Sequence, residues 1–230
     1  MTSRNDRSSP ARGLPRWVDF LAAFFLLIGL SPVFLLCALA VRFSSKGPIF
    51  FSQQRVGRKG RLFRLIKFRS MRVQQRGPEI TAGDDQRITR IGKILRGTKL
   101  DELPELINIL KGDMAFVGPR PETPRFVDPS DVRWRRILER RPGLTDPVTI
   151  RLRNEEKLMA GITGDRETFY RNVLQPYKLE GYIRYHEQRT VRSDLWVIIK
   201  TLWVVVTPSS ADLPALEHVD SERQSGRQGG

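Results

Sequence analysis

Two adjacent acidic residues, Asp101 and Glu102, lie in a basic region of the chain and could act as a nucleophile or as metal ligands. Apolar residues at positions 103, 106, 107 and 110 follow the spacing of one helix face. Pro104 fits a helix here only in its first turn, where backbone N–H groups have no partner. The pattern therefore predicts that the acidic pair lies at or near a helix N-terminus. Such a place attracts phosphate and favours an ionised carboxylate.

A structural role for this acidic pair is also open. Acidic residues at a helix start are commonly caps, and Thr98 followed by Asp101 resembles a capping box. The choice between capping and chemistry then depends on the other motifs of the chain.

The composition indicates an anionic partner. The chain has 230 residues, a net charge of +15 and a pI of about 10.8. Nucleic acid, an anionic membrane surface and phosphorylated substrates all fit this charge. Cys37 is the only cysteine, which excludes an internal disulfide and a thiolate zinc cluster. His186 and His218 are far apart in sequence, so we expect both to be ordinary structural or surface residues.

A long apolar segment covers Trp17–Val41 and is polar only at Asp19 and Ser31. As one helix it would span about 37 Å, enough for a bilayer core of about 30 Å. Ser31-Pro32 interrupts it, because proline removes a helix hydrogen bond and kinks the helix. Basic residues flank both ends, which favours cytoplasmic placement of both. A re-entrant helix satisfies these features, and a transmembrane helix that tolerates proline is the alternative.

The elements that must position the acidic pair follow from the rest of the pattern. Alternating residues over 48–57 and 62–71 around a glycine-containing turn predict a β-hairpin. Period-2 spacing then places Lys67 and Arg69 on one face of the second strand. The apolar segment Leu195–Val206 is too short to span a membrane, so we expect either an interfacial helix or a buried core helix. Further helices are expected over 88–95, 103–110, 132–140, 157–160 with 166–173, and 177–187.

The predicted fold class is α+β and mainly helical, with a re-entrant helix-break-helix, a small β-hairpin and interfacial amphipathic helices. Residues 1–15 and 208–230 are polar and are expected to be disordered tails. Residues 16–42 are expected to form the membrane helix, and residues 43–207 are expected to form one domain on the cytoplasmic face, the candidate catalytic domain.

Several ordered motifs resemble the monotopic polyprenyl-phosphate phosphoglycosyl transferases, a family of bacterial sugar transferases. The resemblance runs from about Arg16 to Val206 and fits the small, single-domain members. The motifs that carry it are Lys46-Gly47-Pro48, Gln54-Arg55-Val56-Gly57, Lys67-Phe68-Arg69-Ser70-Met71, Thr89-Arg90-Ile91-Gly92, Leu95-Arg96, Leu100-Asp101-Glu102-Leu103-Pro104, Leu110-Lys111-Gly112-Asp113-Met114, Val117-Gly118-Pro119-Arg120-Pro121 and Arg141-Pro142-Gly143-Leu144-Thr145.

The resemblance implies an enzyme that transfers a sugar-1-phosphate from a UDP-sugar to polyprenyl (undecaprenyl) phosphate and releases UMP. This is a first membrane step of polysaccharide or glycoconjugate synthesis. The implied nucleophile is Asp101, the cofactor is Mg²⁺, and the break at Ser31-Pro32 returns the helix to the cytoplasmic face of the bacterial inner membrane. The expected partners are the UDP-sugar, polyprenyl phosphate and an anionic membrane surface, without nucleic acid. A homodimer is compatible with this assignment.

The residue types agree with that chemistry. A carboxylate can attack phosphorus and divide one difficult displacement into two easier ones. Mg²⁺ takes one or two carboxylates together with phosphate oxygens and water, which Asp101 and Glu102 could supply. The expected phosphate-binding residues are basic side chains within the family motifs, because arginine binds phosphate in a bidentate manner and lysine offers a point charge. They are Lys67, Arg69, Arg96, Arg120 and Arg141.

One part of the chain departs from the family pattern. After Arg141–Thr145 the commoner continuation is Gly and then a Gln-containing stretch, whereas this chain continues with Asp146-Pro147 and a longer insert that includes Glu155-Glu156. We expect this departure to alter the sugar or nucleotide pocket, so the sugar cannot be inferred from the motifs.

Two other functions compete with the enzyme. A membrane-tethered nucleic-acid binder would explain the +15 charge, but it leaves the acidic pair unexplained and no base-reading module is recognisable. A peripheral protein that anchors a polysaccharide assembly is the third. Release of UMP from UDP-sugars distinguishes the enzyme from both.

Overall fold

A computed structural model describes residues 13–73, 85–162 and 164–207. The predicted tails therefore lie outside the described residues, apart from residues 13–15. The helices are α1 (Arg16–Gly29), α2 (Ser31–Ser44), α3 (Arg90–Gly97), α4 (Glu105–Lys111), α5 (Val132–Leu138), α6 (Pro147–Arg151), α7 (Glu155–Ala160), α8 (Arg166–Phe169), α9 (Gln175–Gln188) and α10 (Val191–Val206), with short helical turns η1 (Arg58–Gly60), η2 (Leu100–Glu102), η3 (Pro124–Phe126) and η4 (Tyr170–Leu174). The strands are β1 (Phe50–Val56), β2 (Leu62–Phe68), β3 (Ala115–Val117) and β4 (Gly143–Thr145).

The apolar N-terminal segment forms two helices that meet at Leu30 with a bend of 65°. Pro32 lies in the first turn of α2, where the missing N–H is not needed. The Ser31 hydroxyl donates a 2.7 Å hydrogen bond to the Ile28 carbonyl and closes the end of α1. Within the described residues, no single helix has the length and apolar composition of a membrane crossing, but the bent α1–α2 pair meets both conditions together.

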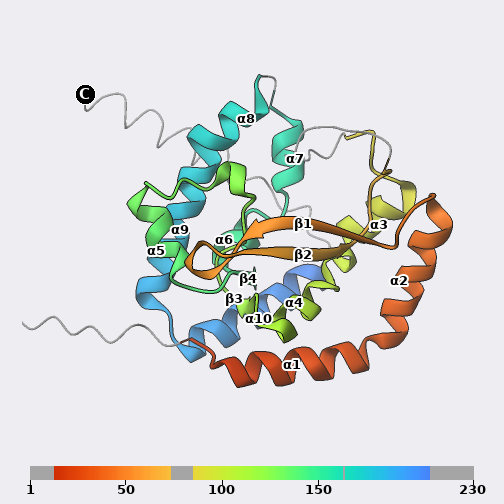
Figure 1. Ribbon diagram of the computed structural model, residues 1–230, viewed down its shortest axis with the longest axis horizontal. Coiled ribbons are helices and arrows are strands. Elements are labelled where there is room, and N and C mark those ends of the chain that lie inside the picture. Colours follow the sequence, from red (N-terminus) through yellow and green to blue (C-terminus); the bar gives the residue numbers. More distant parts are fainter. Residues whose placement is uncertain (1–12, 74–84, 163, 208–230) are drawn as a thin grey trace, which may run out of the picture.

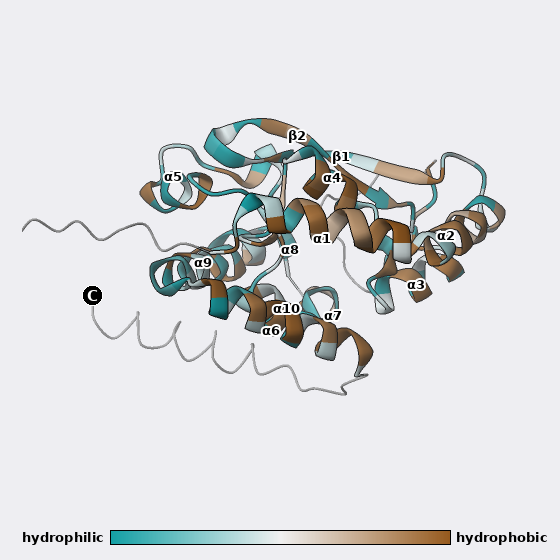
Figure 2. Cartoon of the chain, turned by 90° about the horizontal axis from the view of Figure 1, so that it is seen from below, coloured by the Kyte–Doolittle hydropathy of each residue, from teal (hydrophilic) through white to brown (hydrophobic). Residues whose placement is uncertain are grey.

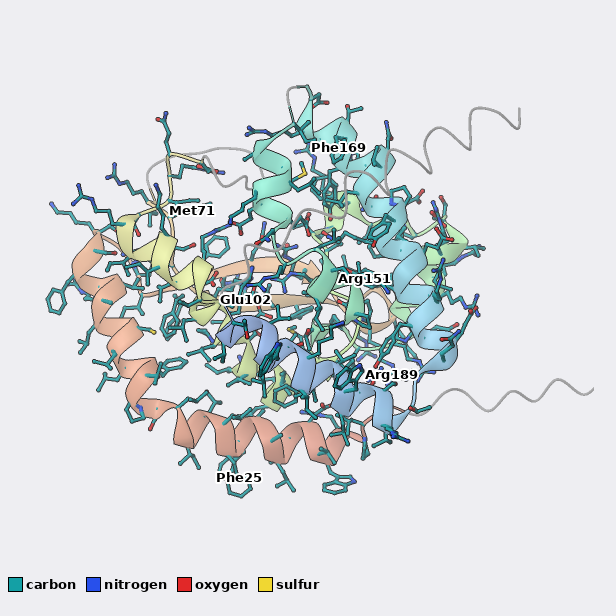
Figure 3. The ribbon with its side chains drawn as sticks, turned by 180° about the vertical axis from the view of Figure 1, so that it is seen from behind. Phe25, Met71, Glu102, Arg151, Phe169 and Arg189 are labelled. Atoms are coloured by element: carbon teal, nitrogen blue, oxygen red, sulfur yellow. The ribbon has the colours of Figure 1, made fainter. Side chains whose placement is uncertain are left out.

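Helix α1 has an inner side that packs on the domain and an outer side that is exposed. Its inner side carries the buried residues Asp19 and Ala23, and the Asp19 carboxylate accepts a 3.2 Å hydrogen bond from the backbone N–H of Phe116 in β3. Its outer side exposes large apolar residues, of which Trp17 is 66% and Phe25 is 65% exposed. Figure 3 shows Phe25 pointing away from the body of the protein. The segment thus presents an apolar surface while one carboxylate fixes it to the domain.

Helix α10 repeats this arrangement at the other end of the chain. Val197 on its inner side is buried, whereas Trp196 and Trp203 on its outer side are 62% and 70% exposed. It is therefore not a buried core helix, which was one of the two expectations for this segment. Figure 2 shows hydrophobic residues along α1, α2 and α10.

The predicted β-hairpin is present as an antiparallel pair, β1–β2, which lies across the middle of the molecule (Figure 1). Its register places Phe51 opposite Lys67 and Val56 opposite Leu62, and η1 forms the turn. Strand β2 ends at Phe68. Arg69 therefore leaves the strand instead of sharing a strand face with Lys67, and this part of the expected pattern is wrong.

A second, two-stranded sheet pairs β3 with β4 in parallel, and the sequence pattern did not predict it. Its strands are three residues each, too short for a periodic signal. The two backbones approach closely at Gly143, because a Cβ atom there would lie 2.1 Å from the Gly118 nitrogen. The Gly-Pro and Pro-Gly motifs therefore mark a close contact as well as loops.

Three hydrophobic clusters hold these elements together. One joins α5–α9 and includes Trp134 and Leu174. A second joins α1, α4, α10 and the two sheets around Ile109 and Met114. The third packs α2 and α3 against Phe68 of β2. The hairpin and α4 thus lie where α1 and α2 meet the rest of the domain.

Candidate active site

Asp101 and Glu102 lie in the short helical turn η2, ahead of α4 rather than inside its first turn. The turn begins after Lys99, whose φ of 59° is left-handed. Thr98 closes the C-terminal end of α3 by donating a 2.8 Å hydrogen bond to the Ile94 carbonyl. Neither η2 nor α4 has a side-chain cap. The capping box is therefore absent, and the capping explanation for Asp101 fails.

Asp101 is buried, with 6% exposure, and its Oδ1 has no hydrogen-bond partner among the described residues. A buried polar atom without a partner is costly, so its retention suggests that a ligand satisfies it. Burial and the neighbouring Glu102 carboxylate raise the pKa of Asp101, and Lys67 offsets part of that rise. A substrate phosphate or a cation bound near this oxygen would therefore alter the pKa of Asp101.

Glu102 binds two cations. Lys67 Nζ lies 2.9 Å from Glu102 Oε1, and Arg120 Nη2 donates a short hydrogen bond to the same oxygen. Burial opposes ionisation of Glu102, but Arg120 and Lys67 outweigh it and hold its pKa well below the usual range. The surroundings therefore favour the ionised form of Glu102 more strongly than that of Asp101. Figure 3 shows it in the interior, between η2 and the hairpin.

Glu105 adds a third carboxylate, which the sequence analysis did not single out. It is 1% exposed, and its Oε1 lies 3.2 Å from Lys67 Nζ, although neither oxygen has a hydrogen bond of good geometry. Burial raises the pKa of Glu105, and the attraction of Lys67 only partly compensates. Lys67 is thus shared by two carboxylates.

Asn108 positions this cluster. It is fully buried, and its side chain donates to the Arg64 carbonyl at 2.7 Å and accepts from the Ile66 N–H at 3.0 Å. These two bonds fix α4 against β2, on which Lys67 is the next residue. The only sequence signal for Asn108 was a polar residue in an otherwise apolar helix, which is too general to assign.

Arg96 approaches the acidic turn from α3. Its guanidinium donates to the Ser70 hydroxyl at 3.2 Å and forms a two-pronged ion pair with Glu156 of α7. Helix α3 can approach this closely because Gly92 has no side chain. A Cβ atom at Gly92 would lie 2.0 Å from the Ser70 carbonyl oxygen, so any other residue would push the helix away. Arg96 is near enough to lower the pKa of Asp101 electrostatically.

The segment that departs from the family pattern, which begins at Asp146, also contacts the candidate active site. Asp146 caps α6 by accepting hydrogen bonds from the N–H groups of Val148 and Thr149, at 2.6 and 3.0 Å. Helix α7 follows and supplies Glu156 to Arg96. The segment that departs from the family pattern thus forms helices, and one of them contacts the predicted site residue Arg96. The sequence pattern did not predict this contact for either Glu155 or Glu156.

The structure brings together four of the predicted side chains, Asp101, Glu102, Lys67 and Arg120, with Arg96 beside them. It places two others elsewhere. Arg69 is buried and donates to the Ser45 carbonyl at 2.6 Å and to the Val41 carbonyl at 3.3 Å, at the end of α2. Arg141 donates to the Gly112 carbonyl at 3.0 Å, beside the hairpin turn.

The donor set is compatible with a magnesium ion shared with substrate. No group of three or more His, Cys, Asp or Glu side chains in the described part of the chain could form a complete metal cage. Mg²⁺ needs only one or two carboxylates when phosphates and water complete its shell, and the Asp101 oxygen without a partner could supply one of them.

Comparison with known proteins now defines the class. The family model for bacterial sugar transferases matches residues 11–208, so the chain belongs to that family and is a transferase. A UDP-glucose:undecaprenyl-phosphate glucose-1-phosphate transferase of Caulobacter vibrioides is 34% identical over 85% of this chain and 71% of its own length.

Other relatives share shorter regions. A UDP-N-acetylgalactosamine-undecaprenyl-phosphate N-acetylgalactosaminephosphotransferase of Aeromonas hydrophila is 42% identical over 57% of this chain and 32% of its own length. The exopolysaccharide production protein ExoY of Sinorhizobium fredii is 39% identical over 61% of this chain and 70% of its own length. The chain therefore spans most of some relatives and about a third of others.

Proposed function

We propose that this enzyme transfers a sugar-1-phosphate from a UDP-sugar to polyprenyl phosphate, with Asp101 as the nucleophile. The observation that supports this best is the buried Asp101 carboxylate, which has one oxygen without a partner among the described residues and is next in the chain to Glu102 with its two cations. The names of the relatives support the substrate classes.

In the first step, an Asp101 oxygen attacks the β-phosphorus of the UDP-sugar. The bond from that phosphorus to the bridging oxygen breaks, and UMP leaves with the electron pair. In the second step, a phosphate oxygen of the lipid attacks the same phosphorus and displaces the Asp101 carboxylate. Each displacement is easier than a direct exchange between two anions. Bound Mg²⁺ would neutralise charge on the diphosphate.

The side chains of this site have distinct roles in the proposal. Glu102 keeps Lys67 and Arg120 close to the attacked phosphate while compensating their charge. Arg96 could exchange its Glu156 partner for a phosphate, since both are anionic acceptors that match a guanidinium. The raised pKa of Asp101 would fall when these cations turn toward it, because a nearby positive charge favours the ionised form.

The two-step reaction is tested by UMP release without acceptor. Purified enzyme mixed with Mg²⁺ and UDP-glucose, UDP-galactose or UDP-N-acetylgalactosamine should release about one UMP per enzyme with the correct donor. Mass spectrometry should then find the sugar-phosphate on the peptide that contains Asp101. Strict dependence of UMP release on polyprenyl phosphate, with no adduct, would support direct attack by the lipid instead.

We also propose that α1–α2 is re-entrant and lies on the cytoplasmic face of the inner membrane. Its bend, its outward apolar residues and basic residues at both ends support this placement. With Cys37 replaced by Ser, single cysteines at Leu14 and Lys46 should react with an impermeant reagent only from the cytoplasmic side. Labelling of Leu14→Cys from outside would show that the segment crosses the bilayer.

A further inference from the structure

A basic pocket of about 450 Å³ lies at the turn of the β-hairpin, away from the acidic turn. Lys67 and Leu62 are five positions apart on β2, so at about 3.3 Å per residue the two ends are separated by roughly 17 Å. The charged residues that line the pocket are Arg58, Lys59, Arg61, Lys111, Arg141 and Asp113. Five cations thus surround one carboxylate.

The positive charge of this pocket is not compensated locally. Among the ion pairs between described residues, none includes Lys59, Arg61 or Lys111. Within the described part of the chain, Arg58 and Arg141 donate to backbone carbonyls, those of Glu139 and Gly112, and these neutral acceptors do not offset a positive charge. Burial together with the nearby Arg16 and Arg58 lowers the pKa of Arg141, a sign that like charges are crowded here.

Arg16 connects this pocket to the apolar surface of α1. Its Nη2 donates to the Leu110 carbonyl at 2.8 Å, close to Gly112 of the pocket, whereas its buried Nη1 has no partner among the described residues. Its guanidinium carbon lies 6.0 Å from the centre of the Phe20 ring. Phe20 and Trp17 are 45% and 66% exposed on the outer side of α1. An apolar surface therefore leads directly to a cluster of cations.

We propose that this pocket binds the phosphate of an anionic membrane lipid whose acyl chains lie against the outer side of α1. The inference rests on the proposed membrane position of α1, but not on the transfer chemistry at Asp101. A soluble phosphate would match the cations equally well, but it has no apolar part that could contact the adjoining aromatic residues. The site would hold the start of α1 and the hairpin turn at the level of the headgroups.

The test measures lipid retention by the full chain in a nonionic detergent, using native mass spectrometry. The probes are phosphatidylglycerol, phosphatidylcholine, inorganic phosphate and UMP. The wild type should retain phosphatidylglycerol in preference to phosphatidylcholine. The double variant Lys59→Gln/Lys111→Gln should retain it roughly 25-fold less, since each of the two basic groups contributes roughly fivefold near an anionic headgroup.

Two matched variants complete this experiment. Lys157→Gln/Arg184→Gln removes the same charge from α7 and α9, which contribute no residue to the pocket, and should retain the lipid as the wild type does. Lys59→Arg/Lys111→Arg keeps the charge and should also retain it. Equal loss in the pocket and control variants, or no loss in either, would overturn the proposal. So would binding of phosphate or UMP, sensitive to the pocket variant, without retention of phosphatidylglycerol.

UMP release, measured in parallel, separates this proposal from the proposed function. Absence of transfer in every variant and the wild type, with lipid retention as expected, would reject the enzyme assignment alone. Normal transfer with no selective lipid retention would reject the lipid site alone.

Discussion

Glu102, which is partly buried, and Glu122, which is buried, are both carboxylates with cationic partners, yet their surroundings differ in one respect. Around Glu122 the charges and hydrogen bonds are complete: Lys178 Nζ lies 2.9 Å from Oε1, Tyr170 donates to that oxygen, and Arg55 lies 3.8 Å from Oε2. Burial opposes ionisation of Glu122, but Lys178 and Arg55 lower its pKa. This network joins the hairpin to α9 and has the character of a structural core.

Around Glu102 the carboxylates outnumber the cations with which they form direct ion pairs. In direct ion pairs, Glu102 has Lys67 and Arg120, and Glu105 competes with it for Lys67. The third carboxylate, Asp101, is in none of these ion pairs and is influenced only electrostatically by Lys67, Arg96 and Lys99. Burial raises the pKa of Asp101 and of Glu105, and Asp101 Oδ1 has no partner. Buried groups with perturbed pKa values and unmet hydrogen bonds are typical of functional sites. The comparison indicates that excess carboxylate, rather than burial of charge alone, distinguishes the candidate active site.

The largest expected effect is on Asp101. Asp101→Asn should reduce sugar-phosphate transfer by roughly 10⁴-fold or more, since a covalent mechanism depends on its nucleophile. Its thermal stability should not fall, because the change removes one of three mutually repelling carboxylates. Transfer assays and thermal unfolding of the same preparation would measure both. Glu122→Gln is the matched control and should show the reverse, with lower stability and transfer within tenfold of the wild type. Loss of stability in Asp101→Asn that accounts for its lost activity would make Asp101 structural.

Lys178 tests the balanced side of the comparison. Lys178→Met should destabilise the protein by roughly 3–5 kcal/mol, because it leaves the buried Glu122 charge without its main partner. Chemical or thermal unfolding would measure the loss. Lys157→Met on the exposed side of α7 serves as the control and should change stability by less than about 0.5 kcal/mol. A similar loss in both variants would show that the Glu122 network does not have the structural role inferred here.

The sequence was sufficient to predict the elements with a strong period or a breaker. The hairpin, the break at Ser31-Pro32 and most helices lie where alternation, proline and apolar spacing indicated. The motifs also brought Asp101, Glu102, Lys67 and Arg120 into one proposed site before any coordinates. Local patterns report such features because each depends on residues close together in the chain.

Other features depend on contacts between distant residues, and the sequence could not reveal them. Arg69 and Lys67 are two positions apart, but the strand ends between them and Arg69 turns to Ser45. Glu105 joins the acidic cluster only because Asn108 fixes α4 to β2. The parallel β3–β4 pair brings together segments more than twenty residues apart, and no local period specifies that pairing.

Glu105 offers a finer test of the excess charge. Its pKa is raised in the folded state, so folding disfavours its ionised form, and stability should decrease as pH rises through that pKa. Glu105→Gln should remove this decrease and make the protein more stable than the wild type at pH 8, because the buried charge is no longer formed. Unfolding at pH 4.5 and pH 8 would measure it, with the exposed Glu139→Gln as control. A less stable Glu105→Gln at pH 8 would mean that the Lys67 ion pair outweighs burial.

The smallest expected effect tests whether unmet hydrogen bonds alone mark a functional site. Both ring nitrogens of His186 are buried without a partner among the described residues. The charged groups that act on it are mainly arginines, Arg189 and Arg140 among them, with the single carboxylate of Asp194. Burial, together with these arginines, lowers the pKa of His186 from 6.5 to about 4. The unfolded chain therefore takes up a proton at a higher pH than the folded one, and stability falls as pH decreases from 6.5 toward 4.

His186→Gln should remove this loss, which amounts to about 1 kcal/mol between pH 7 and pH 5.5. It should leave transfer unchanged at pH 7, where the imidazole is neutral in the folded protein. Unfolding midpoints at the two pH values and a transfer assay would measure these effects. A large fall in transfer in His186→Gln would contradict this comparison. Buried groups without hydrogen-bond partners would then mark the active site of this enzyme better than the excess of carboxylates around Glu102 does.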